Sequence, residues 1–199
     1  YKVIDKHEKE GILIDNFWLA SGYSSGEEDN LRYVFNWNHK RFPDPKKFFE
    51  NMNARGINVI PNLKPGILKR HPYIDLFEKN DVFIKTPDGK APYYGRWWGG
   101  EGRFFDFTGP KGRDTWKQLL EENILKMGTK TVWNDNCEYD SLMDKDDICD
   151  FDGKGGTIAQ LKPIMSTLMC KVGADAVVEH NAKARPYMAV SYTHLRAHE

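Results

Sequence analysis

The chain has 199 residues, 40% of them apolar and 13% aromatic, so it can bury one sizeable hydrophobic core. Lysine plus arginine and aspartate plus glutamate both number 29, so no net charge attracts nucleic acid or an anionic membrane surface. No apolar run reaches the roughly 20 residues of a membrane-spanning helix. The three cysteines lack CxxC spacing, which predicts free thiols and neither a zinc site nor a disulfide framework. A neutral partner is therefore expected.

Three segments repeat one pattern, in which an amphipathic stretch is followed by a glycine and then by a β-rich run. Gly11 precedes ILIDNFWL, Gly56 precedes INVIPNL, and Gly128 precedes TKTVWND. A glycine that closes a helix before a short loop and a strand is typical of alternating helices and strands. A fourth strand is predicted at PYMAV, residues 186–190.

Helices are predicted between these strands. The segment PKKFFENMNARG, residues 45–56, starts with a proline at a first-turn position, and RDTWKQLLEENILKMG, residues 113–128, has the same helical spacing of apolar residues. A third helix is expected to begin after Thr157, whose side chain can cap it. The residues predicted to face the core are Phe48, Phe49, Met52, Trp116, Leu119, Leu120, Leu125, Ile158, Leu161, Met165, Leu168 and Met169.

This alternation favours a parallel sheet, and the mostly apolar strands indicate a sheet that is covered on both faces. An open doubly wound sheet and a (β/α)8 barrel both fit, and in both the functional groups lie at the carboxyl ends of the strands. No glycine-rich phosphate loop follows a strand, because GKGG at 153–156 lacks the GxxxxGK[ST] spacing. This argues against nucleotide binding.

The connection between Gly66 and Pro110 is long and rich in glycine and aromatic residues. It contains a hairpin-like turn, TPDGK, followed by APYYGRWWGGEGRFFDFTGP. A loop of this length at the strand ends is more often functional than idle. Its aromatic side chains suit the apolar faces of sugar rings, but a β-rich subdomain that fills its own core explains the pattern equally well.

The segment TVWNDNCEYD places a carboxylate where an apolar strand ends. Strand alternation puts Val132 and Asn134 on one side, and Trp133 and Asp135 on the other. Asp135 is therefore expected to face the open mouth of the sheet beside an aromatic ring. From the pattern alone, Asp135 could cap the following turn or act in catalysis.

Three stretches in this order resemble glycoside hydrolase family 31, the retaining α-glycosidases: FNWNHKRFPDPKKFFENMNARGINVIPNLKPG, RWWGGEGRFFDFTGP and VWNDNCEYD. The family pattern runs from a Phe-Thr-Trp-Asp segment and RFPDP, through WPG and PDFTNP motifs, to a W-x-D-M-N-E nucleophile motif. The resemblance covers residues 1–191 and implies a partial (β/α)8 barrel with a β-rich insertion after the second strand of the segment. Residues 192–199 are expected to be a non-native tail outside this catalytic domain.

The resemblance implies a retaining, exo-acting α-glycoside hydrolase that cleaves terminal α-linked sugars, with no metal or cofactor expected. Asp135 matches the nucleophile, which would attack the anomeric carbon and form a covalent glycosyl-enzyme. The general acid of the family lies on a later strand, so the segment by itself is expected to be inactive. The residues carried over to the substrate site are Trp98, Trp133, Asn136, Lys64, Ser21, Tyr23 and Asp106.

Departures from the family pattern bear on the sugar that is bound. Family α-glucosidases carry an aspartate-rich strand end where this chain has Trp18-Leu19-Ala20-Ser21-Gly22-Tyr23, and Lys64 stands at an acidic family position. For Lys64, an ordinary surface lysine is an equally good interpretation. The replacement of one carboxylate by small residues, together with the gain of an ammonium, favours two alternatives, an α-glucosyltransferase and an α-N-acetylgalactosaminidase. A non-catalytic carbohydrate-binding homologue is a third.

The aspartates near the end of the chain are interpreted as a solvated acidic loop, and their spacing does not match a calcium-binding loop. They are Asp140, Asp144, Asp146, Asp147, Asp150 and Asp152. The sequence indicates no oligomeric state, and a bacterial cytoplasmic location is only the default expectation.

Overall fold

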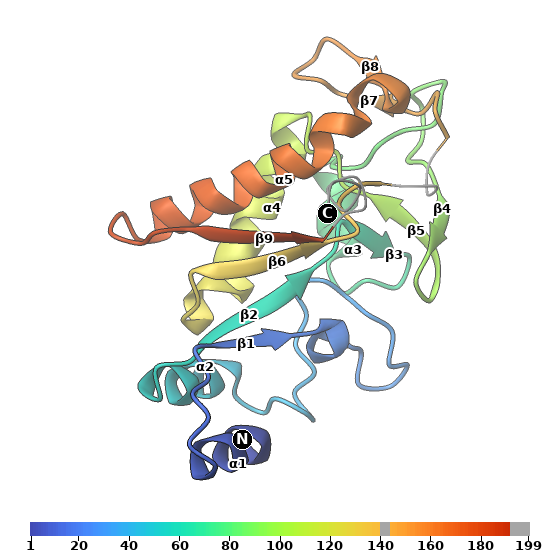
Figure 1. Cartoon of the computed structure of the whole chain (residues 1–199). Coiled ribbons are helices and arrows are strands. Elements are labelled where there is room, and N and C mark those ends of the chain that lie inside the picture. Colours follow the sequence, from blue (N-terminus) through green and yellow to red (C-terminus); the bar gives the residue numbers. More distant parts are fainter. Residues whose placement is uncertain (140–143, 192–199) are drawn as a thin grey trace.

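The computed structural model describes residues 1–139 and 144–191. Its centre is a parallel sheet whose strands follow the order of the chain: β1 (Asn16–Leu19), β2 (Asn58–Leu63), β6 (Thr131–Asp135) and β9 (Tyr187–Ser191). All four arrowheads point to the same end of the sheet (Figure 1). Because the strand order never reverses, the connectivity is that of a barrel and not of a doubly wound sheet. The barrel is unclosed, since β1 and β9 each pair on one side only within the described residues.

Helices join the successive strands, as the sequence predicts. They are α2 (Pro45–Ala54), α4 (Pro110–Asn123), which the short 3-10 turn η2 (Leu125–Met127) follows, and α5 (Ile158–His180). The Asp44 side chain accepts a hydrogen bond from the Lys47 N–H (2.9 Å), and Gln160 Oε1 accepts one from the Thr157 N–H (3.0 Å), so α2 and α5 have satisfied first turns. The predicted core residues of these segments are buried, except that Phe48 and Leu168 are half-buried.

The three glycines predicted to end helices all have positive φ angles: 71° at Gly11, 75° at Gly56 and 116° at Gly128. Gly11 follows the first helix, α1 (Lys2–Lys9), which Arg55 ties to the end of α2 by hydrogen bonds to Glu8 (2.6 and 2.9 Å). The strand expected at residues 12–19 is shorter than predicted, because β1 begins only at Asn16.

The two faces of the sheet differ. Val132 and Asn134 face α5, where Asn134 Nδ2 lies 3.5 Å from Cys170 Sγ, and the predicted alternation of this strand is confirmed. The opposite face is the inside of the unclosed barrel, and there Trp18 packs edge-on against Trp133 with ring centroids 5.7 Å apart. Trp18 remains 48% exposed, so the expectation of a sheet covered on both faces is wrong for the described residues. Too few strands are present to enclose this face.

The long connection after β2 folds as a subdomain beyond the strand ends. It contains β3 (Gly66–Leu68), an unpredicted helix α3 (Ile74–Lys79), β4 (Gly95–Trp97) and β5 (Gly100–Phe104), with the three strands in the antiparallel order β3-β5-β4. The TPDGK turn is confirmed by a hydrogen bond from the Gly89 N–H to the Thr86 carbonyl (2.7 Å).

The aromatic residues of this subdomain divide between two roles. Phe104, Phe105 and Trp97 are buried in its core, whereas Trp98 is 65% exposed. Trp97 lies flat over Gly66, where an added Cβ would come within 2.3 Å of the indole ring. The subdomain therefore fills its own core and still leaves the Trp98 ring exposed at the surface.

The acidic segment forms a small hairpin of β7 (Ile148–Cys149) and β8 (Gly156–Thr157). Its interpretation as a solvated loop is wrong at Asp147, which is fully buried. Asp140 and the predicted tail at 192–199 lie outside the described residues.

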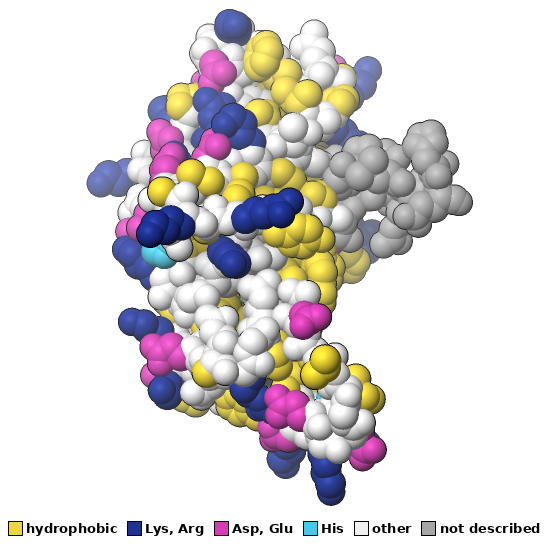
Figure 2. Space-filling model, turned by 60° about the vertical axis from the view of Figure 1, so that its left-hand side comes forward, with side chains coloured by type: hydrophobic (Ala, Val, Ile, Leu, Met, Phe, Trp, Pro, Cys, Tyr) yellow, Lys and Arg dark blue, Asp and Glu magenta, His cyan; other side chains and the backbone are white. Residues whose placement is uncertain are grey.

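The face shown in Figure 2 carries both signs of charge scattered among hydrophobic side chains. This agrees with the equal numbers of acidic and basic residues. None of the helices in the described part of the chain combines the length and apolar character that crossing a bilayer requires.

Candidate active site

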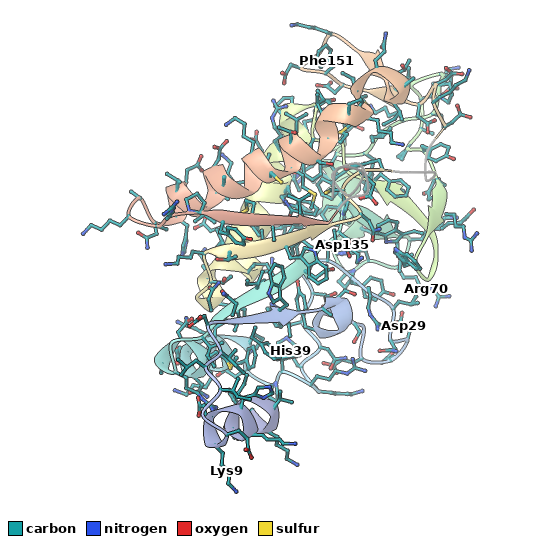
Figure 3. The ribbon with its side chains drawn as sticks, in the orientation of Figure 1. Lys9, Asp29, His39, Arg70, Asp135 and Phe151 are labelled. Atoms are coloured by element: carbon teal, nitrogen blue, oxygen red, sulfur yellow. The ribbon has the colours of Figure 1, made fainter. Side chains whose placement is uncertain are left out.

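Asp135 is the last residue of β6, and both of its carboxylate oxygens accept hydrogen bonds. Oδ2 accepts hydrogen bonds from Asn62 Nδ2 on β2 (3.2 Å) and from Lys64 Nζ, which also forms an ion pair with it. Oδ1 accepts one from the Asn136 backbone N–H (3.0 Å). Figure 3 shows Asp135 at the carboxyl ends of the strands, where the sequence predicts it.

Lys64 also links Asp135 to the subdomain. Its ammonium donates to Asn136 Oδ1 (2.6 Å), and the same oxygen accepts a hydrogen bond from the indole N–H of Trp98 (3.2 Å). Asn136 has a left-handed φ of 53°, a conformation that asparagine tolerates better than most residues. The Lys64 side chain is 18% exposed, so the interpretation as an ordinary surface lysine is wrong.

Two tryptophans line the inside of the sheet beside the carboxylate. Trp133 lies two residues before Asp135 on the same face of β6, and Trp18 of β1 packs against it. Both rings are partly accessible. Flat apolar rings next to a carboxylate and amides suit a sugar, which has apolar CH faces and hydroxyl groups.

A cavity of about 310 Å³ opens between the loop after β1, the end of β2 and the turn that carries Trp98. Its charged lining residues are Arg32 and Lys64, and no aspartate or glutamate of the described residues lines it. The complete lining is Ser21, Ser24, Asn30, Leu31, Arg32, Val34, Asn62, Lys64, Gly66, Trp97, Trp98 and Gly99. Asp135 borders the cavity through its contacts with Asn62 and Lys64.

Besides Trp133, the structure brings five of the predicted side chains to this region and places another beneath it. Asp135, Lys64, Asn136 and Trp98 form one connected group, and Ser21 lines the cavity. Tyr23 is buried, and its hydroxyl donates to the Asn62 carbonyl (2.9 Å). Because its polar atom is already satisfied, Tyr23 supports the end of β2 and does not line the cavity.

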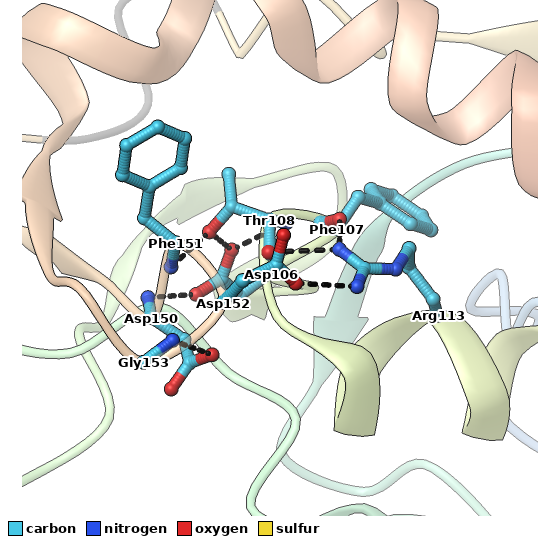
Figure 4. A network of polar contacts seen from close by, with 8 residues as sticks. All are labelled: Asp106, Phe107, Thr108, Arg113, Asp150, Phe151, Asp152 and Gly153. Carbon is cyan, nitrogen blue, oxygen red and sulfur yellow. Dashed lines mark hydrogen bonds and ion pairs between the residues drawn. The ribbon is translucent and has the colours of Figure 1, made fainter.

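Asp106, like Tyr23, is not among the residues that line the cavity. Its Oδ1 accepts hydrogen bonds from the Thr108 N–H (2.9 Å) and hydroxyl (2.5 Å), and its Oδ2 accepts one from the Asp150 N–H (2.6 Å), as Figure 4 shows. Burial raises the pKa of this carboxyl above its ordinary value. Asp106 thus fastens the acidic hairpin to the start of α4, and the structure does not bring it into the cavity.

Sequence reasoning missed Asn62 and Arg32, which the fold places in the cavity wall. Asn62 interrupts the otherwise apolar run INVIPNL near its carboxyl end, so a polar residue at a strand end was the available signal. Arg32 lies in an irregular loop and has no such signal. No group of three potential metal-ligating side chains occurs among the described residues.

A model of the TIM-barrel domain of family 31 glycosyl hydrolases matches residues 1–196. Alpha-glucosidase 2 of Bacillus thermoamyloliquefaciens is 29% identical over 165 residues, which are 79% of this chain and 20% of that protein. Neutral alpha-glucosidase AB of Sus scrofa is 30% identical over 125 residues, 61% of this chain and 13% of that protein. The chain spans about a fifth or less of the length of these curated relatives.

Solved structures share the fold. The glucosidase II alpha subunit superposes with a TM-score of 0.80 at 22% identity, covering 95% of this chain and 21% of that one. A sulfoquinovosidase from E. rectale gives a TM-score of 0.78 at 19% identity, with 96% and 28% of the two chains covered. At these identities the likeness concerns the barrel architecture alone.

Proposed function

The chain belongs to the family 31 glycosyl hydrolases, and we propose that it forms part of the catalytic barrel of a retaining, exo-acting α-glycosidase. The proposed barrel segment is residues 1–191, with 192–199 as a non-native tail. One observation carries the proposal. Asp135 presents a carboxylate at the carboxyl end of a barrel strand, beside Trp133 and within hydrogen-bond reach of Asn62 and Lys64.

In the proposed reaction, a carboxylate oxygen of Asp135 forms a bond to the anomeric carbon while the bond to the leaving oxygen breaks. Asn62, Lys64 and the Asn136 N–H hold the carboxylate in place before attack. A carboxylate offers about four lone-pair positions, so three contacts leave one for the sugar. Trp133, Trp98 and Trp18 would face the sugar ring.

Retention requires a second carboxyl group about 5.5 Å from the nucleophile, which protonates the leaving oxygen and later activates water. No aspartate or glutamate of the described residues lines the cavity, so we propose that this acid comes from a later strand of a complete barrel. The experiments that test this function therefore use the enzyme with its complete barrel.

The first substrate class to consider is α-linked glucosides, because the relatives are named alpha-glucosidases. A second candidate, an α-glucosyltransferase or an α-N-acetylgalactosaminidase, is favoured by the cavity lining. Lys64, Arg32 and the side-chain amide groups offer hydrogen-bond donors, and Ala20 replaces a carboxylate of the family pattern. Paired α-glucoside, α-galactoside and N-acetyl-α-galactosaminide substrates, assayed with and without an acceptor sugar, distinguish these activities.

The nucleophile assignment is tested by trapping the covalent intermediate. A 5-fluoroglycosyl fluoride should add one sugar mass to the peptide that contains Asp135, as measured by mass spectrometry of the complete enzyme. Asp135→Ala should lower kcat/KM by at least about a thousandfold, because it removes the bond-forming group. Glu50→Gln, an exposed change on α2, is the matched control.

A label on another residue, or an Asp135→Ala enzyme within tenfold of the wild type, would contradict the assignment. A homologue that only binds carbohydrate would give no label and no turnover at all.

A further inference from the structure

Asn62 is a buried asparagine with one unused hydrogen-bonding atom beside the proposed nucleophile. It is 4% exposed, and its Nδ2 donates to Asp135 Oδ2 (3.2 Å). Its Oδ1 is buried and has no hydrogen-bond partner within residues 1–139 and 144–191. Buried polar atoms are nearly always paired, so an orphaned oxygen at a cavity wall needs an explanation.

The orientation of this amide follows from its partner. An ionised carboxylate can only accept hydrogen bonds, so the end of Asn62 that faces Asp135 must be the NH2 group. The free end is therefore the carbonyl oxygen, an acceptor. The backbone of Asn62 is also fixed, because its carbonyl accepts the Tyr23 hydroxyl and β2 is paired with β1 and β6 on either side.

Asn62 lines the cavity that Lys64, Arg32 and Trp98 also line. Lys64 Nζ donates to Asp135 and Asn136, and no cation of the described residues donates to the free oxygen of Asn62. The cavity wall thus includes a residue whose buried carbonyl oxygen lacks a donor in the described part of the chain. A ligand that supplies an O–H or N–H there removes the cost of leaving this oxygen unpaired.

We propose that Asn62 Oδ1 accepts a hydrogen bond from the substituent on C2 of the bound sugar. This inference rests on the function proposed above, in which Asp135 attacks C1. Asn62 is bonded to the attacking carboxylate, and the donor-bearing substituent nearest to C1 is that on C2, since the ring oxygen carries no proton. The substrate class is therefore an α-glycoside with a hydroxyl or N–H on C2, and Asn62 is a specificity-determining residue.

Such a contact gains strength during reaction. Hydrogen bonds to the C2 substituent of retaining glycosidase substrates strengthen as the oxocarbenium-like transition state forms. Because one amide joins this substituent to Asp135, a substrate without the C2 donor leaves the Asn62 carbonyl oxygen unpaired in the transition state. The loss is therefore expected in kcat more than in KM.

The test compares a C2-hydroxy α-glycoside with its 2-deoxy analogue on the complete enzyme and on Asn62→Leu. The ratio of kcat/KM for the two substrates should fall at least about tenfold in Asn62→Leu relative to the wild type. Differences in the intrinsic reactivity of the substrates cancel, as do differences in the fraction of folded enzyme. Asn62→Ser serves if the leucine variant does not fold.

Asn30→Gly is the matched control. Asn30 also lines the cavity, but its Oδ1 already accepts a hydrogen bond from Arg41 (3.2 Å), and glycine tolerates its left-handed φ of 56°. Its substrate ratio should stay within about twofold of the wild type, whatever its overall rate.

These measurements distinguish failure of the C2 contact from failure of the proposed glycosidase function. If the fluorosugar labels Asp135 and the Asn62 variants keep the wild-type ratio within twofold, the C2 contact is refuted and the glycosidase remains. If nothing labels Asp135 and no α-glycoside turns over, the proposed function fails and the inference fails with it.

Discussion

Asp147 is a fully buried carboxylate on the short segment before β7. Its Oδ2 accepts a hydrogen bond from the Asp144 N–H (2.9 Å), while its Oδ1 has no hydrogen-bond partner in the described part of the chain. Burial raises its pKa from 3.8 to about 6, and the charges of Asp144 and Asp146 add to the shift. The ionised form is thus disfavoured in the fold.

This shift predicts the pH dependence of stability. Between about pH 4 and pH 6 the folded chain binds more protons at Asp147 than the unfolded chain, so stability falls as pH rises through this window. Asp147→Asn should flatten that part of the profile and raise the melting temperature near neutral pH, with little effect at the acidic end. Thermal unfolding followed by circular dichroism measures both.

Asp15→Asn, at an exposed position before β1 that does not act on Asp147, is the control for general charge removal. If the wild type and Asp147→Asn show parallel pH profiles, this carboxylate does not carry the effect.

Among the elements, the acidic hairpin is attached through Asp106 of the segment before α4 and through backbone pairing of Ile148 with Lys85. Asp106 accepts three hydrogen bonds, and Arg113 of α4 donates to the Thr108 carbonyl (2.8 Å) and pairs with Asp152 (2.5 Å). These contacts join β7 and β8 to the helix that precedes β6. They explain why an acidic segment without a core of its own has a defined place.

We expect Asp106→Ala to release this hairpin. Two N–H groups and one hydroxyl would lose their acceptor, and the free energy of unfolding should fall by about 1–3 kcal/mol. Urea unfolding measures the stability, and limited proteolysis at the exposed Phe151 measures the release. Asp15→Ala, at an exposed position before β1, is a control that should change neither. Unchanged proteolysis of Asp106→Ala would show that the hairpin is held by other contacts.

At the scale of the whole molecule, the sheet is a barrel with an open side. The edges of β1 and β9 are unpaired among the described residues, and Trp18 and Tyr187 are exposed. Exposed edges and aromatic rings of this kind favour association with other chains. The cavity beside the proposed nucleophile Asp135 is lined by no aspartate or glutamate of the described residues.

The isolated chain of 199 residues should therefore associate with itself and show no turnover. Light scattering should give a mass that rises with concentration, and the α-glycosides cleaved by the complete enzyme should stay intact. The complete enzyme, assayed in parallel, is the positive control. Turnover by the purified chain would mean that its second carboxyl group lies within these residues.

The local features of the fold could be predicted from the sequence. Gly11, Gly56 and Gly128 end helices as expected, and the two-residue period of β6 places Trp133 and Asp135 on one face. These predictions hold because they depend on backbone preferences and on side-chain alternation within a few residues.

The partners of the site residues could not be predicted in the same way. The resemblance predicts Tyr23, Asp106 and Lys64 in the substrate site, yet Tyr23 and Asp106 are buried supports. Only Lys64 reaches Asp135. A motif specifies which residue stands at a position, but burial and contacts are set by the segments that pack around it.

The sequence by itself determined the family, the alternation of helices and strands, and the strand end that carries Asp135. Tertiary structure decided that the strands follow one another in barrel order and that the Trp98 indole donates a hydrogen bond to Asn136. It also decided that Asn62, 73 positions before Asp135, holds the carboxylate and keeps one oxygen free. The reason is that periodicity arises within one segment, whereas contacts between distant segments depend on how the strands align.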